Sequence, residues 1–253
     1  MPSIDLSGKV ALITGASRGI GRETAIRFGE AGAAVAINHQ RSPGEAAEVA
    51  ERIGTDRALV LQGDIGDPEA VREIIDRAVA RFGRLDILIN NAGTFERNPF
   101  DGDDYEHWQS GWMRTFEVNI FGAANASFLA LRQFRRQGGG KIINVASRAA
   151  FRGETEFADY GASKAALVNL TISLARACGG ENVVSTCVAP GFIETAMAAS
   201  ELEIRREEIE SQIPLGRVGT AGDVAGVILF LASSYGDYLN GATIDVNGGS
   251  WFH

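Results

Sequence analysis

The sequence predicts an α/β protein with one Rossmann-like, doubly wound parallel sheet of about seven strands and helices on both faces. Short apolar runs rich in β-branched residues alternate with longer segments of helical period along the whole 253-residue chain. These runs are apolar throughout, as in strands that are buried on both faces. No repeat, low-complexity tract or long linker interrupts the alternation. We therefore expect residues 1–253 to form a single domain.

The boundaries follow from this alternation and from local stop signals. Strands are expected at residues 10–13, 33–37, 58–61, 86–89, 141–145, 183–188 and 243–246. Helices are expected at residues 20–30, 45–53, 68–82, within 104–136, and at 158–177 and 223–232. Asp67-Pro68 supplies an N-cap and a proline at the first helical position. Gly179-Gly180 ends the fifth helix.

Composition excludes several classes of function. Thirty-two acidic residues against 24 Lys and Arg give a net charge of −8, which argues against nucleic acid or a membrane surface as a partner. No apolar run approaches the roughly 18 residues that span a bilayer. Residues 1–8 lack a basic stretch followed by an apolar core, so we expect no signal peptide and a cytoplasmic protein.

Cysteine and histidine positions give no support for a disulfide or a metal site. Cys178 and Cys187 lack CxxC spacing, and the three histidines are scattered along the chain. We expect two buried, reduced thiols and no bound metal.

Polar residues recur where the predicted strands end. They are Thr14-Gly15, Asn38, Asp64, Asn90-Asn91, Ser147 and Pro190-Gly191. Because the carboxyl ends of parallel strands share one edge of a sheet, these residues are expected to meet at a ligand site.

The first of these positions opens a glycine-rich turn with the spacing G-x3-G-x-G, at Gly15, Gly19 and Gly21. Glycines allow a tight turn and close backbone approach, and the following helix offers free N–H groups to a pyrophosphate. The alternative is a glycine turn without a ligand. Its position directly after the first strand favours dinucleotide binding.

The end of the second strand bears on which dinucleotide binds. The stretch Asn38-His39-Gln40-Arg41 has no carboxylate to accept a bond from a ribose 2′-hydroxyl. Arg18 and Arg41 suit a 2′-phosphate instead, so NADP(H) is favoured over NAD(H), unless both arginines are ordinary surface charges. Asp64 either contacts the adenine or caps the next helix.

Tyr160 and Lys164 lie four residues apart on a predicted helix, which places their side chains on one face about 6 Å apart. A neighbouring ammonium favours a phenolate, so we expect Lys164 to lower the Tyr160 pKa toward a range useful for proton transfer. The same spacing also occurs on ordinary helix faces. The pair alone is therefore weak evidence for catalysis.

Taken together, these residues resemble the short-chain dehydrogenase/reductase family over essentially the whole chain. The resemblance rests on residues 14–21 and 90–93 and on Asn119, Ser147, Tyr160, Lys164 and Pro190-Gly191, in matching order and spacing. It is greatest to the 3-oxoacyl-carrier-protein reductase and sugar or polyol dehydrogenase branches.

The resemblance implies a carbonyl–alcohol oxidoreductase with a catalytic tetrad. Tyr160 would be the general acid or base, Ser147 would hold the substrate oxygen, and Lys164 would bind the nicotinamide ribose. Asn119 would hold a helix kink and a water. The residues implied or inferred to bind the cofactor are Gly15, Ser17, Arg18, Gly19, Ile20, Gly21, Asn38, Arg41, Asp64, Ile65, Asn91, Ala92, Gly93, Tyr160, Lys164, Pro190, Gly191, Ile193 and Thr195.

Substrate identity is left open by the sequence. We expect it to depend on three segments, residues 94–112, 148–159 and 196–214, the last within a substrate loop at about 194–216. That last segment is either a lid or an amphipathic surface helix. Arg132, Arg135 and Arg136 would suit an acidic carrier protein, whereas the acids and aromatics of 94–112 would suit a polyol.

The remaining expectations concern assembly and the alternative functions. It implies a homotetramer, and Trp251-Phe252 would be buried at an interface. A sugar or polyol dehydrogenase that uses NAD(H) is the main alternative to an NADP(H)-dependent 3-oxoacyl-type reductase. An isomerase or lyase on the same scaffold and a non-catalytic nucleotide-binding regulator are the remaining alternatives.

Overall fold

Seven parallel strands form one sheet in the order β3-β2-β1-β4-β5-β6-β7 in the computed structural model, which describes residues 4–253. The strands are β1 (Val10–Ile13), β2 (Ala34–His39), β3 (Ala58–Gln62), β4 (Ile87–Asn90), β5 (Gly140–Val145), β6 (Val183–Pro190) and β7 (Thr243–Val246). The predicted sheet is confirmed. Residues 1–3, part of the segment considered for a signal peptide and of the predicted domain, lie outside the described residues.

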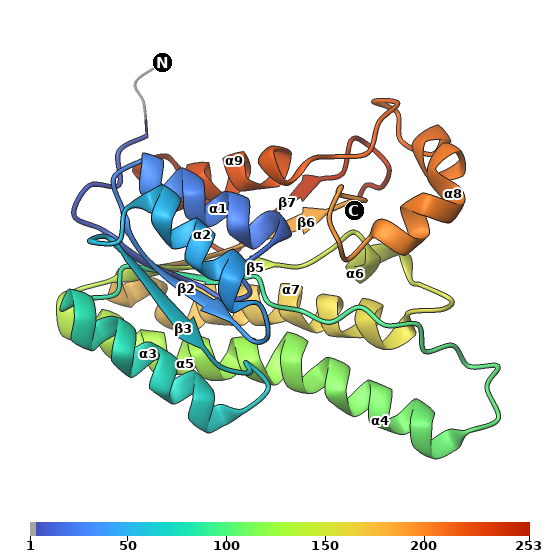
Figure 1. The fold of residues 1–253 in the computed structure, drawn as a ribbon, viewed down its shortest axis with the longest axis horizontal. Coiled ribbons are helices and arrows are strands. Elements are labelled where there is room, and N and C mark those ends of the chain that lie inside the picture. Colours follow the sequence, from blue (N-terminus) through green and yellow to red (C-terminus); the bar gives the residue numbers. More distant parts are fainter. Residues whose placement is uncertain (1–3) are drawn as a thin grey trace.

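Helices cover both faces of this sheet (Figure 1). One face carries α1 (Gly19–Glu30), α2 (Pro43–Ile53) and α9 (Ala221–Ala232). The other carries α3 (Pro68–Phe82), α5 (Ala123–Gln137) and α7 (Ala158–Cys178). Each layer packs its own apolar core, with Phe28 in the first and Phe134 in the second. Both rings are completely buried.

Strands β2 and β6 run two residues past their predicted ends. Asn38 and His39 are polar, yet they continue the parallel register with β3 opposite Leu61 and Gln62. Pairing with a neighbouring strand therefore overrides the polarity that suggested a strand end. As a result, Asn38 lies within the strand itself.

Helix starts also differ from the prediction where a cap was overlooked. The last helix was expected to begin at Asp223, but Thr220 is its N-cap and Asp223 occupies the third helical position. Their side chains bond each other's backbone in a capping box. The Asp67 cap was predicted correctly, since its carboxylate accepts from the Glu69 N–H.

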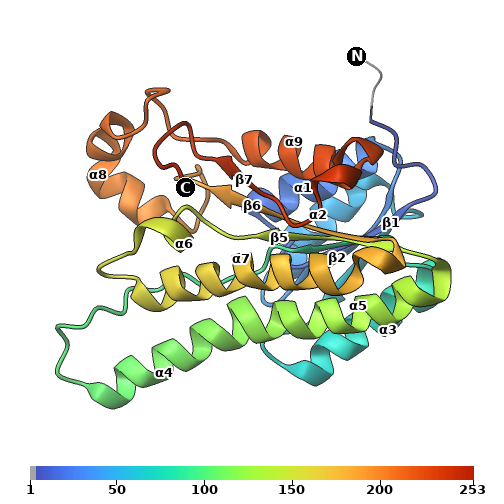
Figure 2. The ribbon, with the colours of Figure 1, turned by 180° about the vertical axis from the view of Figure 1, so that it is seen from behind.

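The long helical stretch is two helices joined by a π-turn. Helix α4 (Tyr105–Phe116) leads through residues Glu117–Gly122, which form the π-turn, into α5. Seen from behind, α4 extends beyond the end of α7, on the side where α6 (Ala149–Arg152) and α8 (Ala199–Ser211) lie (Figure 2). Helix α6 was not predicted.

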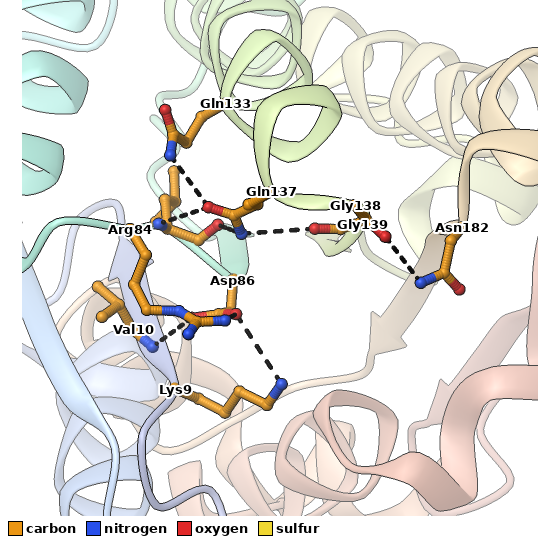
Figure 3. Close-up of polar contacts among 10 residues, drawn as sticks. Lys9, Val10, Arg84, Asp86, Gln133, Gln137, Gly138, Gly139 and Asn182 are labelled. Atoms are coloured by element: carbon orange, nitrogen blue, oxygen red, sulfur yellow. Dashed lines mark hydrogen bonds and ion pairs between the residues drawn. The ribbon is translucent and has the colours of Figure 1, made fainter.

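Hydrogen bonds and ion pairs of polar side chains connect the segments at the amino edge of the sheet (Figure 3). Asp86, just before β4, accepts from the Val10 N–H at 2.9 Å and from Arg84 at 2.6 and 2.8 Å, and lies 3.9 Å from Lys9. Gln137 bonds both backbone groups of Leu85. Both Asp86 carboxylate oxygens therefore have partners.

No helix among residues 4–253 is long and apolar enough to cross a bilayer. Cys178 and Cys187 are free and buried, as predicted.

Candidate functional site

A cavity of about 740 Å³ opens at the carboxyl edge of the sheet. Its lining includes nearly all of the predicted site residues: Gly15, Ser17, Arg18, Gly19, Ile20, Asn38, Arg41, Asp64, Ile65, Asn91, Ala92, Gly93, Ser147, Tyr160, Lys164, Pro190, Gly191, Ile193 and Thr195. Gly21 and Asn119 do not line the cavity, but each lies directly behind a residue that does: Gly21 behind Gly15, and Asn119 behind Gly93. The strand ends thus meet at one cavity, although Thr14 and Asn90 are buried and do not line it. That a ligand binds there stays a prediction.

The glycine loop leaves room that a side chain would fill. Gly15 and Gly19 both have positive φ, at 63° and 57°, which other residues rarely adopt. A Cβ on Gly19 would lie 3.2 Å from the Thr195 methyl group, across the cavity mouth. A Cβ on Gly21 would lie 2.4 Å from the Gly15 carbonyl oxygen. The loop therefore fits a ligand that approaches backbone N–H groups closely, as a dinucleotide pyrophosphate does.

Two asparagines hold this loop in place. The Asn38 Oδ1 accepts from the Gly15 N–H at 3.2 Å, and its Nδ2 donates to the Gly63 carbonyl at 3.1 Å. Asn91 donates to the carbonyl oxygens of Thr14 and Gly15 at 2.8 and 3.0 Å. These amides shape the cavity wall by bonding to backbone.

The cavity next to the end of β2 is lined by one carboxylate and several arginines. Asp64 accepts from Arg114 at 2.7 Å and from Gln40 at 2.8 Å, and does not cap α3, which Asp67 does. Arg18 and Arg41 are exposed at the cavity rim.

His39, which was given no role from the sequence, is buried there. Its Nδ1 has no hydrogen-bond partner within residues 4–253. Burial lowers the pKa of His39.

Tyr160 is held in an apolar wall. The Phe95 ring meets it edge-on at 4.8 Å between centroids and stacks on Phe157 at 4.0 Å. Burial raises the pKa of Tyr160 to about 12, which outweighs the opposing effect of nearby Ser147. The expected lowering of this pKa is therefore wrong for this geometry, because desolvation penalises the phenolate more strongly than the neighbours stabilise it.

Lys164 is buried beside the phenol. Its Nζ donates to the Val145 carbonyl at 2.8 Å and lies 5.5 Å from the Tyr160 ring centroid. Burial lowers the pKa of Lys164 to about 8. The ammonium is thus mostly charged at neutral pH and loses its proton in mildly alkaline solution.

Asn119 lies in the π-turn between α4 and α5. Its side chain accepts from the Thr94 N–H at 2.9 Å, donates to the Thr94 carbonyl at 3.2 Å and donates to the Ser163 hydroxyl at 2.9 Å. The π-turn therefore carries an amide side chain that joins the loop after β4 to helix α7. Single π-turns are common at functional sites.

Ser147 follows β5 and faces the cavity. Its Oγ accepts from the Ala149 N–H at 3.1 Å, so its own O–H remains available to donate. That geometry suits a hydroxyl that binds the oxygen of a ligand.

The substrate side differs from the expectation for residues 94–112. Phe95 lines the cavity, but Tyr105, Trp108 and Trp112 form a stack along α4 with Phe100, away from it. Asp104 caps α4 by accepting from the His107 N–H at 2.9 Å. Most of these residues therefore stabilise the projecting end of α4.

Helix α8 has features of both alternatives considered for it. Leu202 and Ile209 are buried in a small core against Phe192, as in an amphipathic surface helix, whereas Ile204 is 79% exposed. Glu201 and Arg205 nevertheless line the cavity. The backbone of Arg205 departs from helical geometry, at φ −132° and ψ 28°.

Nearly the whole length of the chain matches known proteins. The family described as Enoyl-(Acyl carrier protein) reductase matches residues 15–250. The 3-oxoacyl-[acyl-carrier-protein] reductase of Staphylococcus aureus is 37% identical over 96% of this chain and 98% of its own length. The chain belongs to the short-chain dehydrogenase/reductase family. As a member of this family, the protein is an oxidoreductase.

Other similar proteins are named for different activities. The 2-dehydro-3-deoxy-D-gluconate 5-dehydrogenase of Dickeya dadantii is 38% identical over 98% of this chain and 97% of its own length. A glucose/ribitol dehydrogenase structure from Brucella melitensis superposes with a TM-score of 0.92 at 30% identity, covering 99% and 100% of the two chains. The structure of a short chain dehydrogenase from Burkholderia cenocepacia, in complex with NADP, superposes with a TM-score of 0.88 at 35% identity. The match covers 97% of this chain and 98% of that one.

Proposed function

We propose that this short-chain dehydrogenase/reductase interconverts a carbonyl and a secondary alcohol with NADP(H), and that Tyr160 exchanges the proton. The observation that carries the proposal is the convergence of Ser147, Tyr160 and Lys164 on one cavity that also contains the glycine loop. A nicotinamide cofactor, when bound, supplies or accepts the hydride. The residues of this chain would position the reactants and move the proton.

Tyr160 would act as the proton donor in reduction. A pKa of about 12 keeps the phenol protonated at neutral pH, as a general acid requires. Ser147 would donate its free O–H to the same carbonyl oxygen and hold it beside the phenol. The aromatic wall of Phe95 and Phe157 would exclude water from the transferred proton.

Lys164 would bind the cofactor, and Asn119 would position the residues around it. Lys164, anchored by the Val145 carbonyl, would bind the ribose hydroxyls of the cofactor with its remaining N–H donors. Asn119 would fix the loop after β4 against α7, and with it the relative positions of Gly93 and Lys164. We also propose, from the family resemblance, that Asn119 holds a water molecule in the site.

The preference for NADP(H) rests on charge at the cavity rim. Residues 38–41 at the end of β2 include no carboxylate that would repel a 2′-phosphate, and Arg18 and Arg41 both line the cavity. The Burkholderia cenocepacia neighbour in complex with NADP supports the same choice.

The alternatives for the substrate are a 3-oxoacyl group and a sugar or other small secondary alcohol, as the names of the relatives suggest. The arginine cluster Arg132, Arg135 and Arg136 gives a carrier-linked substrate little support. It lies near the end of α5 that leads into β5, at the amino edge of the sheet and opposite the cavity. Arg135 is already paired with Glu181 at 2.7 Å.

A homotetramer is part of the proposal. In the single chain, Phe121, Phe128 and Phe252 are 56%, 62% and 78% exposed, which suits surfaces that another copy covers. Small-angle scattering should give about four times the mass of the chain, and a monomer would contradict the proposal.

A spectrophotometric assay tests the activity. Purified protein is mixed with NADPH or NADH and a panel of 3-oxoesters, sugars and polyol-derived ketones, and the absorbance of the reduced nicotinamide is followed. We expect turnover with a preference for NADPH. Binding of NADPH without turnover of any carbonyl or alcohol would instead favour a regulator, and a preference for NADH would contradict the arginine argument.

A further inference from the structure

Four aspartate, lysine or arginine side chains are buried among residues 4–253, apart from His39, and three of them have polar partners. Asp86 bonds Arg84 and Val10, Asp159 accepts from Thr115 at 2.7 Å, and Lys164 donates to Val145. The fourth is Arg148, which is only 5% exposed. No hydrogen bond or ion pair joins its guanidinium to a residue in the described range, and none of its nitrogens is among the fully enclosed polar atoms without a partner, so they face the cavity.

Arg148 lies at the substrate end of the cavity. It directly follows Ser147 and lines the same cavity, and its backbone N–H donates to the Pro190 carbonyl at 2.9 Å. Its guanidinium carbon lies 4.9 Å from the centroid of the Phe192 ring. Phe192 packs in turn against the small core beneath α8, so this contact holds the side chain in place.

The nearby charges do not neutralise Arg148. Arg152 and Glu154 form an ion pair with each other at 3.5 Å, so their opposite charges largely cancel. Burial lowers the pKa of Arg148 to about 10, and the proximity of Arg152 adds to this effect, while Glu154 opposes it. The guanidinium is still charged at neutral pH.

A structural role alone does not account for this arrangement. An aromatic ring stabilises a cation through its face, but it cannot accept the five N–H donors of a guanidinium. Buried charges in folded proteins are normally paired, because an unpaired charge loses its hydration without compensation. The acceptors for these N–H groups must come from the cavity, where water holds the place that a ligand would take.

We propose that Arg148 binds the carboxylate of the substrate, so that the physiological substrate is an oxo acid or the corresponding hydroxy acid. This inference rests on the proposed carbonyl–alcohol activity and adds the substrate class. A planar carboxylate matches the guanidinium fork and carries the single negative charge that one arginine neutralises. A phosphate dianion would call for a second free cation, and Arg152 is already paired with Glu154.

The position of Arg148 bears on the kind of acid that would bind. Ser147 and Arg148 are consecutive residues that line the same cavity, so one ligand could contact both side chains. An acyl chain linked to a carrier protein through a thioester has no carboxylate to offer.

The test compares each acid with its uncharged ester. Reduction of acetoacetate and levulinate with NADPH is measured beside reduction of their methyl esters, for the unsubstituted protein and for Arg148→Met. We expect at least one acid to exceed its ester in kcat/KM by roughly 100-fold, and Arg148→Met to remove that advantage through a higher KM for the acid. The kcat/KM of the esters should change by less than about threefold.

Two variants serve as controls. Arg148→Lys keeps the charge but loses the fork, so it should keep part of the preference, and it replaces Arg148→Met if that variant does not fold. Arg135→Met removes an exposed, ion-paired arginine outside the cavity and should leave the acid-to-ester ratio unchanged. Circular dichroism and NADPH fluorescence check folding and cofactor binding in each variant.

A binding measurement separates this inference from the proposed activity. Calorimetric titration with levulinate should show binding that is lost in Arg148→Met. Binding of this kind without turnover of any carbonyl would contradict the proposed activity and support the carboxylate site. Equal turnover of acids and esters, or a preference that survives in Arg148→Met, would overturn the carboxylate site and leave the activity intact.

Discussion

The two edges of the sheet satisfy their polar groups in different ways. At the amino edge, the Asp86 carboxylate accepts from Val10 and Arg84, and Gln137 bonds Leu85 (Figure 3). At the carboxyl edge, the Arg148 guanidinium and the His39 Nδ1 have no hydrogen-bond partner in the part of the chain that the structure describes. Folding supplies the partners of Asp86 and Gln137 at the first edge, whereas we infer that ligands supply partners at the second.

We therefore expect polar substitutions at the amino edge to affect stability and those at the carboxyl edge to affect activity. A change at the amino edge removes a bond that the fold itself makes, so it should lower stability and leave catalysis alone. A change at the carboxyl edge removes a group that is free to act on a ligand, so it should lower activity and spare the fold. The predictions below test this division.

The largest effect is expected for Tyr160→Phe. Loss of the phenolic hydroxyl removes the proposed proton donor, so kcat for reduction should fall by about 10³-fold or more. NADPH affinity and the melting temperature should stay close to those of the unsubstituted protein. Steady-state assays and NADPH fluorescence measure the two quantities, and a kcat within tenfold of the original would refute this role for Tyr160.

The second effect concerns the amino edge. Asp86→Ala leaves the Val10 N–H without its acceptor, so the free energy of unfolding should fall by about 2 kcal/mol, measured by urea denaturation. The kcat of the folded fraction should not change. Asp76→Ala, at an exposed position of α3, is the matched control and should have little effect on stability. A loss of kcat without a loss of stability would reverse the proposed division.

The third effect is a pH dependence that comes from the carboxyl edge. Because burial lowers the pKa of Lys164 to about 8, its cation is present below that pH and is lost as the pH rises through it. The Tyr160 pKa of about 12 keeps the phenol protonated over the same range. The kcat/KM for NADPH in reduction should therefore fall about tenfold per pH unit above about 8.

Lys164→Arg provides the control for this profile. An arginine stays charged throughout this range, so the alkaline decline should be reduced or absent in that variant, whatever its absolute activity. A flat profile for the unsubstituted protein up to pH of about 10 would contradict the role of Lys164.

The smallest effect is expected at the cavity rim. Arg41→Ala should raise the KM for NADPH by roughly tenfold and leave the KM for NADH unchanged, because only NADPH carries the 2′-phosphate. Arg52→Ala, an exposed arginine on α2 outside the cavity lining, is the control. Equal changes for both cofactors would indicate a general electrostatic effect instead of phosphate recognition.

Most of the fold and the position of the site could be predicted from local sequence. Continuous apolar strands specify a parallel sheet that is covered on both faces, and the chirality of its crossovers brings the strand ends to one edge. Most of the predicted residues at those ends therefore meet in the cavity, whereas Thr14 and Asn90 are buried and do not line it. The errors arose where a neighbour in space decides the outcome, as when pairing with β3 keeps Asn38 and His39 in a strand.

The sequence by itself determined the reaction class, because the order and spacing of residues such as Ser147, Tyr160 and Lys164 depend only on the chain. The tertiary structure alone decided the electrostatics of the site. The Tyr160 pKa is raised because packing, including the Phe95 ring edge-on at 4.8 Å, buries the phenol, although Lys164 lies beside it. Arg148 is one of many arginines in the sequence, and only packing against Phe192 shows that it is buried and unpaired. Desolvation depends on every atom packed around a group, and such contacts join residues that are far apart in the chain.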